Sequence, residues 1–181
     1  MNDDLETLSG IEAAVWSALE SGVSDPSAPA RTVALATEAL DGGGSVRLVV
    51  LRAIDRADLC LTFFTHRGSG KIAELTAEPK VQVLVWDSAR QFQIRISGEM
   101  EYAQGPQATW ERFGHGTRRN YASSPAPGEV LNDPETVAFD PDPETFMQMT
   151  LRISMIETLV LSPETQRRAR FTKDGAQWIA P

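Results

Sequence analysis

A short segment at residues 63–75, FFTHRGSGKIAEL, contains the residue types of a phosphate-binding turn. An apolar strand pattern leads into Gly and Ser residues, Ser69 can cap a following helix, and Lys71 stands in its first turn. Backbone N–H groups at the start of a helix point outward and suit an anion. A loop for a nucleoside triphosphate needs glycine six residues before the lysine and Ser or Thr after it, but this chain has Thr65 and Ile72 there. The segment therefore predicts a phosphorylated ligand other than ATP with magnesium.

Cationic and amide groups also lie inside segments that otherwise have the apolar pattern of strands: Arg47, Arg52, Gln93 and Arg95. One face of an antiparallel sheet is commonly solvated, so a single arginine there is ordinarily a surface residue. Several cations in neighbouring segments are harder to explain in this way, because buried Arg and Lys need a partner and a phosphate would supply one. With Phe64 as an apolar wall and Thr65 as a hydroxyl, the set predicts a flat, phosphorylated heteroaromatic ligand.

The composition limits the class of protein and its partners. The 181 residues are 41% hydrophobic and 23% charged, which predicts one ordinary domain over residues 1–181. The net charge of −8 argues against nucleic acid or an anionic membrane as a partner. The single cysteine, Cys60, excludes an intrachain disulfide and fits a reducing compartment. No export signal or membrane-spanning stretch is recognisable, so we expect a cytoplasmic protein.

The pattern of elements predicts a mostly β protein with flanking helices. Apolar residues at helical spacing cover residues 5–21, with acidic residues at positions 3, 4 and 6 that favour the start of a helix. Strand patterns follow, with short helices and a hairpin turn at Asp174-Gly175. The strands are expected at 32–40, 46–54, 59–65, 81–86, 92–102, 149–162 and 168–181, and the helices at 69–78 and 106–114. This order predicts an antiparallel sheet closed into a barrel.

Residues 114–145 lack a periodic pattern and are rich in Pro, Gly, Asn and Asp. Such a long connection is either a functional cover or disordered. Arg118, Arg119 and Tyr121 could close over a substrate, although a mobile surface loop is the simpler interpretation. The two histidines, His66 and His115, both lie in loop-like sequence, and we expect both to be exposed to solvent.

Three motifs, RLVVLR at 47–52, FTHRGSGK at 64–71 and QIRISG at 93–98, occur in order within residues 31–102. Together they resemble the FMN-binding core of the pyridoxamine 5'-phosphate oxidase family. The later run WERFGHGTRRNYASSPAPG, at 110–128, resembles a plant and bacterial subgroup of oxidase-related FMN-binding proteins. The resemblance implies an FMN-binding split β-barrel and a homodimer with FMN at its interface.

The resemblance also implies roles for particular residues. Arg47 and Lys71 would bind the FMN phosphate, together with the turn residues Ser69 and Gly70, while Gln93 would bond to the edge of the isoalloxazine. The other residues expected to contact FMN are Leu48, Val49, Val50, Leu51, Arg52, Phe64, Thr65 and Arg170. Arg52 would also face the substrate, which favours a phosphorylated or acidic small molecule. No metal site is expected and no catalytic residue is assigned.

Three positions depart from the family pattern. Gly70 stands where the oxidases commonly have Arg, and the segment QRRAR at 166–170 lacks the histidine of the family's Arg-x-His-x-Arg signature. Leu161 stands where the family has a tryptophan that contacts the flavin. The leading hypothesis is an FMN-dependent oxidoreductase, in which the cofactor carries the difficult chemistry. The alternative is a non-catalytic module that binds flavin or haem.

Overall fold

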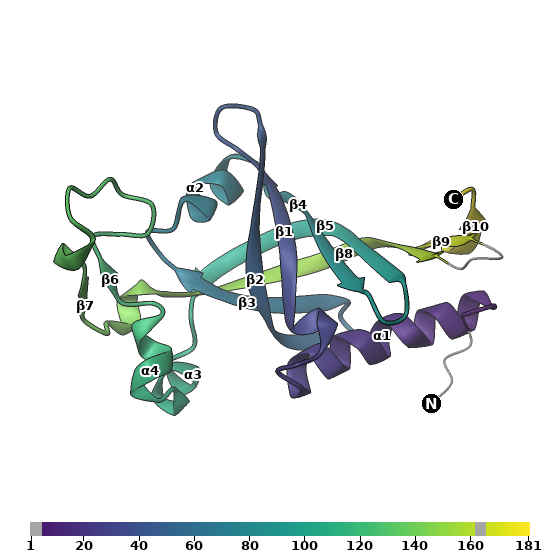
Figure 1. Cartoon of the computed structure of the whole chain (residues 1–181), viewed down its shortest axis with the longest axis horizontal. Helices are drawn as coiled ribbons and strands as arrows, with labels where there is room; N and C mark the ends of the chain where they lie inside the picture. The colour runs from purple at the N-terminus through teal and green to yellow at the C-terminus, as the bar shows by residue number, and fades with distance from the viewer. Residues whose placement is uncertain (1–4, 162–165) are drawn as a thin grey trace.

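Six antiparallel strands form a closed barrel in a computed structural model that describes residues 5–161 and 166–181. The strands follow the order β8-β3-β2-β1-β4-β5, and β5 pairs back onto β8 to close the ring (Figure 1). Their bounds are Thr32–Glu38 (β1), Gly44–Asp55 (β2), Cys60–His66 (β3), Lys80–Asp87 (β4), Phe92–Gln104 (β5) and Phe146–Leu161 (β8). The predicted antiparallel barrel is confirmed. The acidic residues at positions 3 and 4, and the boundary predicted at 162, lie outside the described residues.

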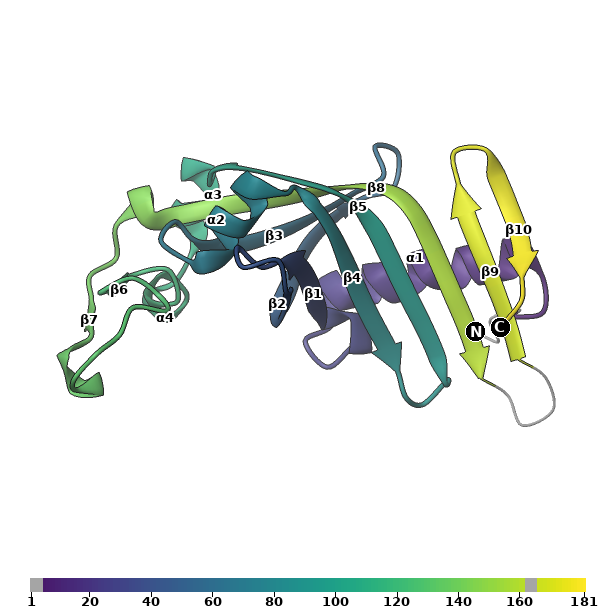
Figure 2. The same cartoon turned by 90° about the horizontal axis from the view of Figure 1, so that it is seen from above.

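The longest strand, β8, has one edge that is divided between two partners. Residues 146–152 pair with β3, whereas residues 155–161 pair with β9 (Gln166–Thr172), which turns into β10 (Gly175–Ile179). The other edge of β8 pairs with β5 along nearly its whole length. The hairpin of β9 and β10 therefore extends the sheet beyond the barrel, as Figure 2 shows.

The first helix, α1 (Leu8–Ser24), begins and ends later in the chain than its periodicity predicted. Thr7 caps it, accepting a hydrogen bond from the Gly10 N–H at 3.0 Å. Its apolar face is buried in the same core as the inner faces of the strands, with Ile11 and Leu19 fully buried. The alternation predicted in β5 is also observed, because Phe92, Ile94 and Ile96 all point into this core. The short 3₁₀ helix η1 (Pro29–Arg31) leads into β1.

A second helix, α2 (Gly70–Ala77), joins β3 to β4, as predicted from the glycine-rich turn. A third, α3 (Gln107–Arg112), follows β5 and opens the long connection. None of the described helices is both long enough and apolar enough to cross a membrane.

The connection at 114–145 is packed rather than disordered. It contains α4 (His115–Arg119), β6 (Ser123–Ser124), η2 (Pro134–Thr136), β7 (Ala138–Phe139) and η3 (Pro143–Thr145). A separate cluster of aromatic side chains joins it to the barrel: Phe64, Trp110, Phe113, Tyr121 and Phe146. These rings come from distant positions at no regular spacing, so no periodic pattern predicts the cluster.

A close approach between β5 and β8 makes Gly98 structurally necessary. The register shifts between Ser97 and Gly98, and a Cβ added to Gly98 would lie 1.9 Å from the carbonyl oxygen of Arg152. We expect Gly98→Ala to destabilise the protein by about 3 kcal/mol, the upper end for overpacking, because backbone cannot move aside as a side chain can. In thermal unfolding, the melting temperature should fall by roughly 6–12 °C. Gly44→Ala is the control, because nothing lies within 4 Å of its added Cβ; equal stability of the two variants would contradict the packing at Gly98.

Candidate functional site

Lys71, in the first turn of α2, is a partly buried cation whose hydrogen-bond partners are hydroxyls. Its Nζ donates to Thr65 Oγ1 at 3.0 Å and to Ser69 Oγ at 2.5 Å. Ser69 occupies the N-cap position, but the predicted cap bond is wrong because its side chain is engaged by the lysine instead. Burial lowers the pKa of Lys71, the positive charge of Arg47 lowers it further, and Glu74 acts in the opposite direction. A buried ammonium in this state favours an anionic ligand.

Arg47 approaches the same turn from β2, and an internal carboxylate already pairs with it. Its Nη2 lies 2.5 Å from Glu74 Oε2, and its guanidinium also contacts the hydroxyls of Thr37 and Ser45. Thr37 in turn donates to Glu74 Oε2 at 2.6 Å. Part of the partner that Arg47 needs is therefore supplied by the protein itself, and its assignment to the FMN phosphate stays a prediction. Of the five guanidinium donors, the Nε and one Nη1 hydrogen have no partner in these contacts, so they are free to bond a ligand.

Sequence reasoning missed Glu74. Burial alone would raise the pKa of its carboxyl, but hydrogen bonds from Thr37, Ser45 and Arg47 outweigh burial and lower the pKa. The available signal was its spacing, because positions three apart on a helix share a face and Glu74 follows Lys71 by one turn.

Arg52, at the irregular end of the β2–β3 pairing, lies against the aromatic cluster. Its Nη2 donates to Tyr121 Oη at 3.3 Å, and its guanidinium carbon lies 5.8 Å from the centre of the Phe64 ring. The two other residues predicted to close over a substrate point elsewhere. Arg118 donates to main-chain oxygens of α3, and Arg119 lies 4.2 Å from the Phe139 ring.

A second group of predicted site residues surrounds Glu157 on β8. Glu157 is only 3% exposed and lies between Arg95 of β5 and Arg170 of β9, which are its neighbours in register. Arg170 Nη2 is 2.9 Å from Glu157 Oε1, Arg95 is in direct contact, and Arg168 is 3.7 Å away. Sequence analysis missed Glu157, because only the strand register shows that it faces these arginines.

The predicted residues therefore fall into two groups within one chain. Arg47, Lys71, Thr65 and Ser69 form the first, whereas Gln93 lies on β5 beside the second. Strands β1 and β4 separate β2 from β5, so at about 4.8 Å per strand the groups are on the order of 14 Å apart along the sheet.

The outer face of this sheet is apolar and exposed. Leu48 of β2 is 70% exposed, Leu84 of β4 is 40% exposed and Trp86 of β4 is 42% exposed. The register aligns Leu48, Ala34, Leu84 and Arg95 in one row, which places Gln93 and Arg95 on the same face. Exposed apolar patches of this kind mark interaction surfaces.

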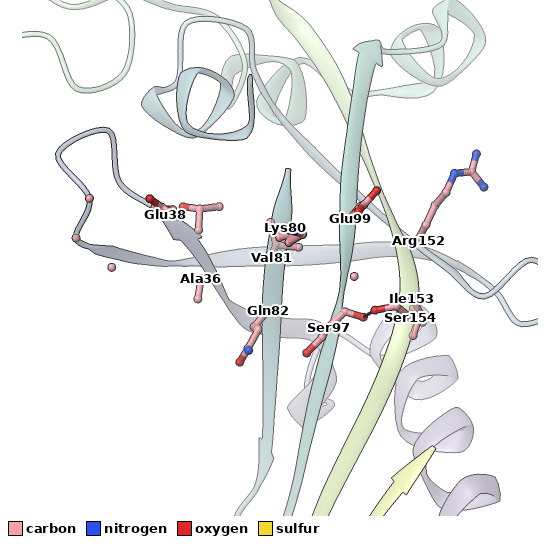
Figure 3. Close-up of a pocket in the computed structure, with 15 residues that line it drawn as sticks. Ala36, Glu38, Lys80, Val81, Gln82, Ser97, Glu99, Arg152, Ile153 and Ser154 are labelled. Atoms are coloured by element: carbon pink, nitrogen blue, oxygen red, sulfur yellow. Dashed lines mark hydrogen bonds between the residues drawn. The ribbon is translucent and has the colours of Figure 1, made fainter. Parts of the chain in front are cut away.

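A groove of about 830 Å³ lies on the sheet between the β1–β2 hairpin and β8. Figure 3 shows Gln82, Ser97 and Ser154 along it, with the Ser154 hydroxyl bonded to the Ser97 carbonyl at 3.2 Å. None of the predicted FMN or substrate residues lines this groove. The two basic groups therefore define the candidate site better than this groove does.

The prediction of two exposed histidines is wrong for His66. It ends β3, is 8% exposed, and its Nδ1 accepts from the Gly68 N–H at 2.9 Å. Burial lowers its pKa, and the charge of Lys71 adds to the effect. His115 in α4 is exposed, as predicted. Within residues 5–161 and 166–181, no His, Cys, Asp and Glu side chains form a group of three that could hold a metal ion.

The residues around α2 fit a phosphate group. Lys71 has no ion-pair partner among the described residues, and Arg47 keeps two free donors. Gly70 begins α2 with open space around it, since nothing lies within 4 Å of an added Cβ. The first backbone N–H groups of the helix are thus accessible to an anion.

A closed six-strand barrel with a basic turn before α2 defines the class of FMN-binding split barrels. The model of the pyridoxamine 5'-phosphate oxidase FMN-binding domain matches residues 13–104, and the chain belongs to this family. FMN is the cofactor of the family. This confirms the resemblance and the cofactor inferred from the three motifs.

Curated relatives match part of the chain. A pyridoxine/pyridoxamine 5'-phosphate oxidase of Psychrobacter cryohalolentis is 33% identical over 123 residues, covering 65% of this chain and 54% of that protein. One from Thermosynechococcus vestitus is 42% identical over 67 residues, or 37% of this chain and 31% of that protein. The matches thus span between 31% and 54% of these relatives' length.

Solved structures match nearly the whole chain. An oxidase-related FMN-binding protein from Nostoc punctiforme has a TM-score of 0.75 at 21% identity, covering 93% of this chain and 96% of its own. PhzG from Burkholderia lata, solved with tetrahydrophenazine-1-carboxylic acid, has a TM-score of 0.74 at 25% identity, covering 99% and 95%.

We expect Lys71 to lower the stability of the ligand-free protein and to raise its affinity for FMN. Burial lowers the pKa of Lys71 in the folded protein, so folding carries a cost for holding the charged lysine, and this cost is relieved as pH rises from the lowered folded pKa toward the unfolded pKa. Lys71→Met should therefore raise the melting temperature of ligand-free protein. It should also weaken FMN by roughly 10- to 100-fold but leave riboflavin unchanged, because one charge-assisted bond to phosphate is lost.

Thermal unfolding and flavin-fluorescence titration measure the two effects. Lys173→Met, at the exposed turn of the C-terminal hairpin, is the matched control. An unchanged preference of the Lys71 variant for FMN over riboflavin would contradict the assignment of Lys71 to the phosphate.

Proposed function

We propose that the protein is an FMN-dependent oxidoreductase that oxidises a small anionic substrate and works as a homodimer with FMN at its interface. The observation that carries the proposal is the pair of cations at α2. Lys71 has only hydroxyl partners, and Arg47 is held with free donors beside it. A phosphate is the group that satisfies both.

We assign the residues of the site to FMN binding and to substrate binding. Arg47, Lys71 and the Ser69–Gly70 turn would bind the FMN phosphate, while Leu48 to Leu51 would lie along the cofactor and Phe64 would cover it. When bound, FMN supplies a two-electron acceptor for the substrate. Gln93 would hydrogen-bond the edge of its ring, and Arg52 would orient the substrate. The aromatic cluster would exclude water from that end of the site.

The separation of the two groups supports the homodimer. Gln93 and Arg170 belong to the second group, which is separated along the sheet from Arg47 and Lys71, and a second copy would supply them to an FMN molecule held at the first group. The exposed apolar face around Leu48, Leu84 and Trp86 offers a surface for that copy. A twofold dimer buries the same patch on both chains.

The comparisons support two chemical classes of substrate. Relatives named pyridoxine/pyridoxamine 5'-phosphate oxidase support a phosphorylated amine or alcohol. PhzG with its bound carboxylic acid supports a planar acid. Gly70 and the histidine-free segment at 166–170 favour a substrate other than pyridoxamine 5'-phosphate. We further propose that residues 1–181 are one FMN-binding domain in the cytoplasm, where a reducing environment keeps the buried Cys60 as a free thiol.

The dimer proposal predicts that a charge on the apolar face separates the chains. Leu84→Asp should give a monomer in sedimentation velocity and weaken FMN at least about tenfold, because each monomer then lacks part of its site. Val130→Asp, at a side chain that is 97% exposed in the long connection, is the control and should stay dimeric. A monomeric Leu84 variant with undiminished FMN affinity would exclude a shared site.

The oxidase proposal predicts a flavoprotein that uses pyridoxamine 5'-phosphate poorly. The visible spectrum of the purified protein should show flavin bands, whereas a haem Soret band would support the non-catalytic alternative. On anaerobic mixing with pyridoxamine 5'-phosphate, flavin bleaching should be slow or absent. Rapid bleaching followed by aerobic turnover of about 1 per second or more would show that the departures at Gly70 and 166–170 are dispensable.

A further inference from the structure

Tyr121 is fixed beside Arg52 by the aromatic cluster. Its side chain is 5% exposed, its ring stacks on Phe113 with centroids 5.9 Å apart, and the Phe146 ring lies at 5.2 Å. Its carbonyl oxygen accepts a hydrogen bond from the Thr145 hydroxyl. Both the ring and the backbone are therefore held, so the phenolic oxygen has a defined position next to the guanidinium.

Arg52 differs from the other strand arginines in its partners. Arg47 is paired with Glu74 and Arg95 with Glu157, whereas Arg52 has no carboxylate partner in the described part of the chain. Its Nε is buried and has no acceptor. A buried, charged donor without an acceptor is unfavourable, so the position is suited to a ligand that brings a negative charge.

The hydroxyl of Tyr121 adds a second donor at the same place. It accepts a hydrogen bond from Arg52 Nη2, so its own proton remains free to donate. A carboxylate has two oxygens that can accept from neighbouring N–H and O–H donors. The partly buried rings of Phe64 and Phe113 belong to the same cluster and favour an aromatic group nearby.

The charge balance favours a carboxylate over a phosphate monoester. A phosphate monoester carries nearly two negative charges at neutral pH, and Arg52 is the single cation in contact with Tyr121 among the described residues. Arg118 and Arg119 lie over the rings of Trp110 and Phe139, and Lys71 donates to the hydroxyls of Thr65 and Ser69. One guanidinium with one hydroxyl matches a monoanion.

We propose that Arg52 and Tyr121 together bind the carboxylate of a planar aromatic substrate, and that Tyr121 determines this specificity. The inference rests on the proposed function, because the flavin would be the partner of that substrate. It differs from that function in naming the substrate class and a residue outside the three motifs.

The test uses 2-naphthoate as the probe, 2-naphthamide as its neutral analogue and 2-naphthyl phosphate as the dianion. Each is titrated into FMN-loaded protein while the flavin absorbance spectrum is recorded. The chain offers a matched control, because its other tyrosine, Tyr102, also uses its hydroxyl, in a bond to Thr76 at 2.6 Å. The variants are Tyr121→Phe, Tyr102→Phe and Arg52→Gln.

Wild-type protein should bind the naphthoate more tightly than the amide or the phosphate. Tyr121→Phe should reduce the preference for naphthoate over naphthamide by about three- to tenfold, the effect of one hydrogen bond, with FMN affinity unchanged. Arg52→Gln should abolish the preference, and Tyr102→Phe should retain it. If Tyr121→Phe keeps the full preference for naphthoate over naphthamide, the proposed role of Tyr121 is wrong. If wild-type protein binds naphthyl phosphate more tightly than naphthoate, the proposed carboxylate specificity is wrong.

Carboxylate binding by Arg52 and Tyr121 can also be tested without FMN. If the protein does not take up FMN, the proposed function fails, and the same titrations followed by tryptophan fluorescence report binding, since Trp110 belongs to the aromatic cluster. In the FMN-free protein, loss of the naphthoate preference in Tyr121→Phe still supports carboxylate binding by Arg52 and Tyr121. Retention of the preference contradicts it. Thermal unfolding of Tyr121→Phe should show a folded protein whose melting temperature falls by no more than roughly 6 °C, because phenylalanine keeps the stacked ring and only the hydrogen bond from Arg52 is lost.

Discussion

The barrel depends on the pairing of β8, which contacts β3, β5 and β9. One edge of β8 pairs with β5 and closes the ring, and the other edge pairs first with β3 and then with β9. Gly98 makes this closure possible, because the backbone of β8 passes where any other residue would carry its Cβ. The same pairing brings Arg95, Glu157 and Arg170 into one row. Closure of the barrel and assembly of the second basic group are therefore consequences of a single set of backbone hydrogen bonds.

The charges within the sheet fall into two kinds. Arg47 and Arg95 each have a carboxylate partner in the protein, and these pairs hold the arginine side chains in place. Lys71 and Arg52 have only hydroxyl partners among the described residues. Because a buried cation without a counter-charge is costly, the second kind marks where a ligand contributes most. The phosphate of FMN, the cofactor of the family, is the ligand that we propose for Lys71.

Membership of the oxidase family accounts for residues 13–104 but not for the whole site. The connection at 114–145 and the C-terminal hairpin lie beyond the family match. These are the segments that supply Tyr121 at Arg52 and two of the three arginines around Glu157, namely Arg168 and Arg170. A common cofactor site combined with different outer segments is how one fold serves several substrates.

Local patterns in the sequence were sufficient for the strands and for α2, whereas phosphate binding by the turn before α2 stays a prediction. Alternation in β5 and the Gly-Ser-Gly-Lys turn are set by residues close in the chain, and the three ordered motifs were sufficient to indicate the family and its cofactor. Glu74 could have been predicted from its helical spacing from Lys71. Three other features could not be predicted: the role of Glu157, the burial of His66 and the contact of Tyr121 with Arg52. Each depends on residues 13 to 69 positions apart or on the packing of a whole segment. Strand register and aromatic packing decide such contacts, and both are properties of the folded chain rather than of any local stretch.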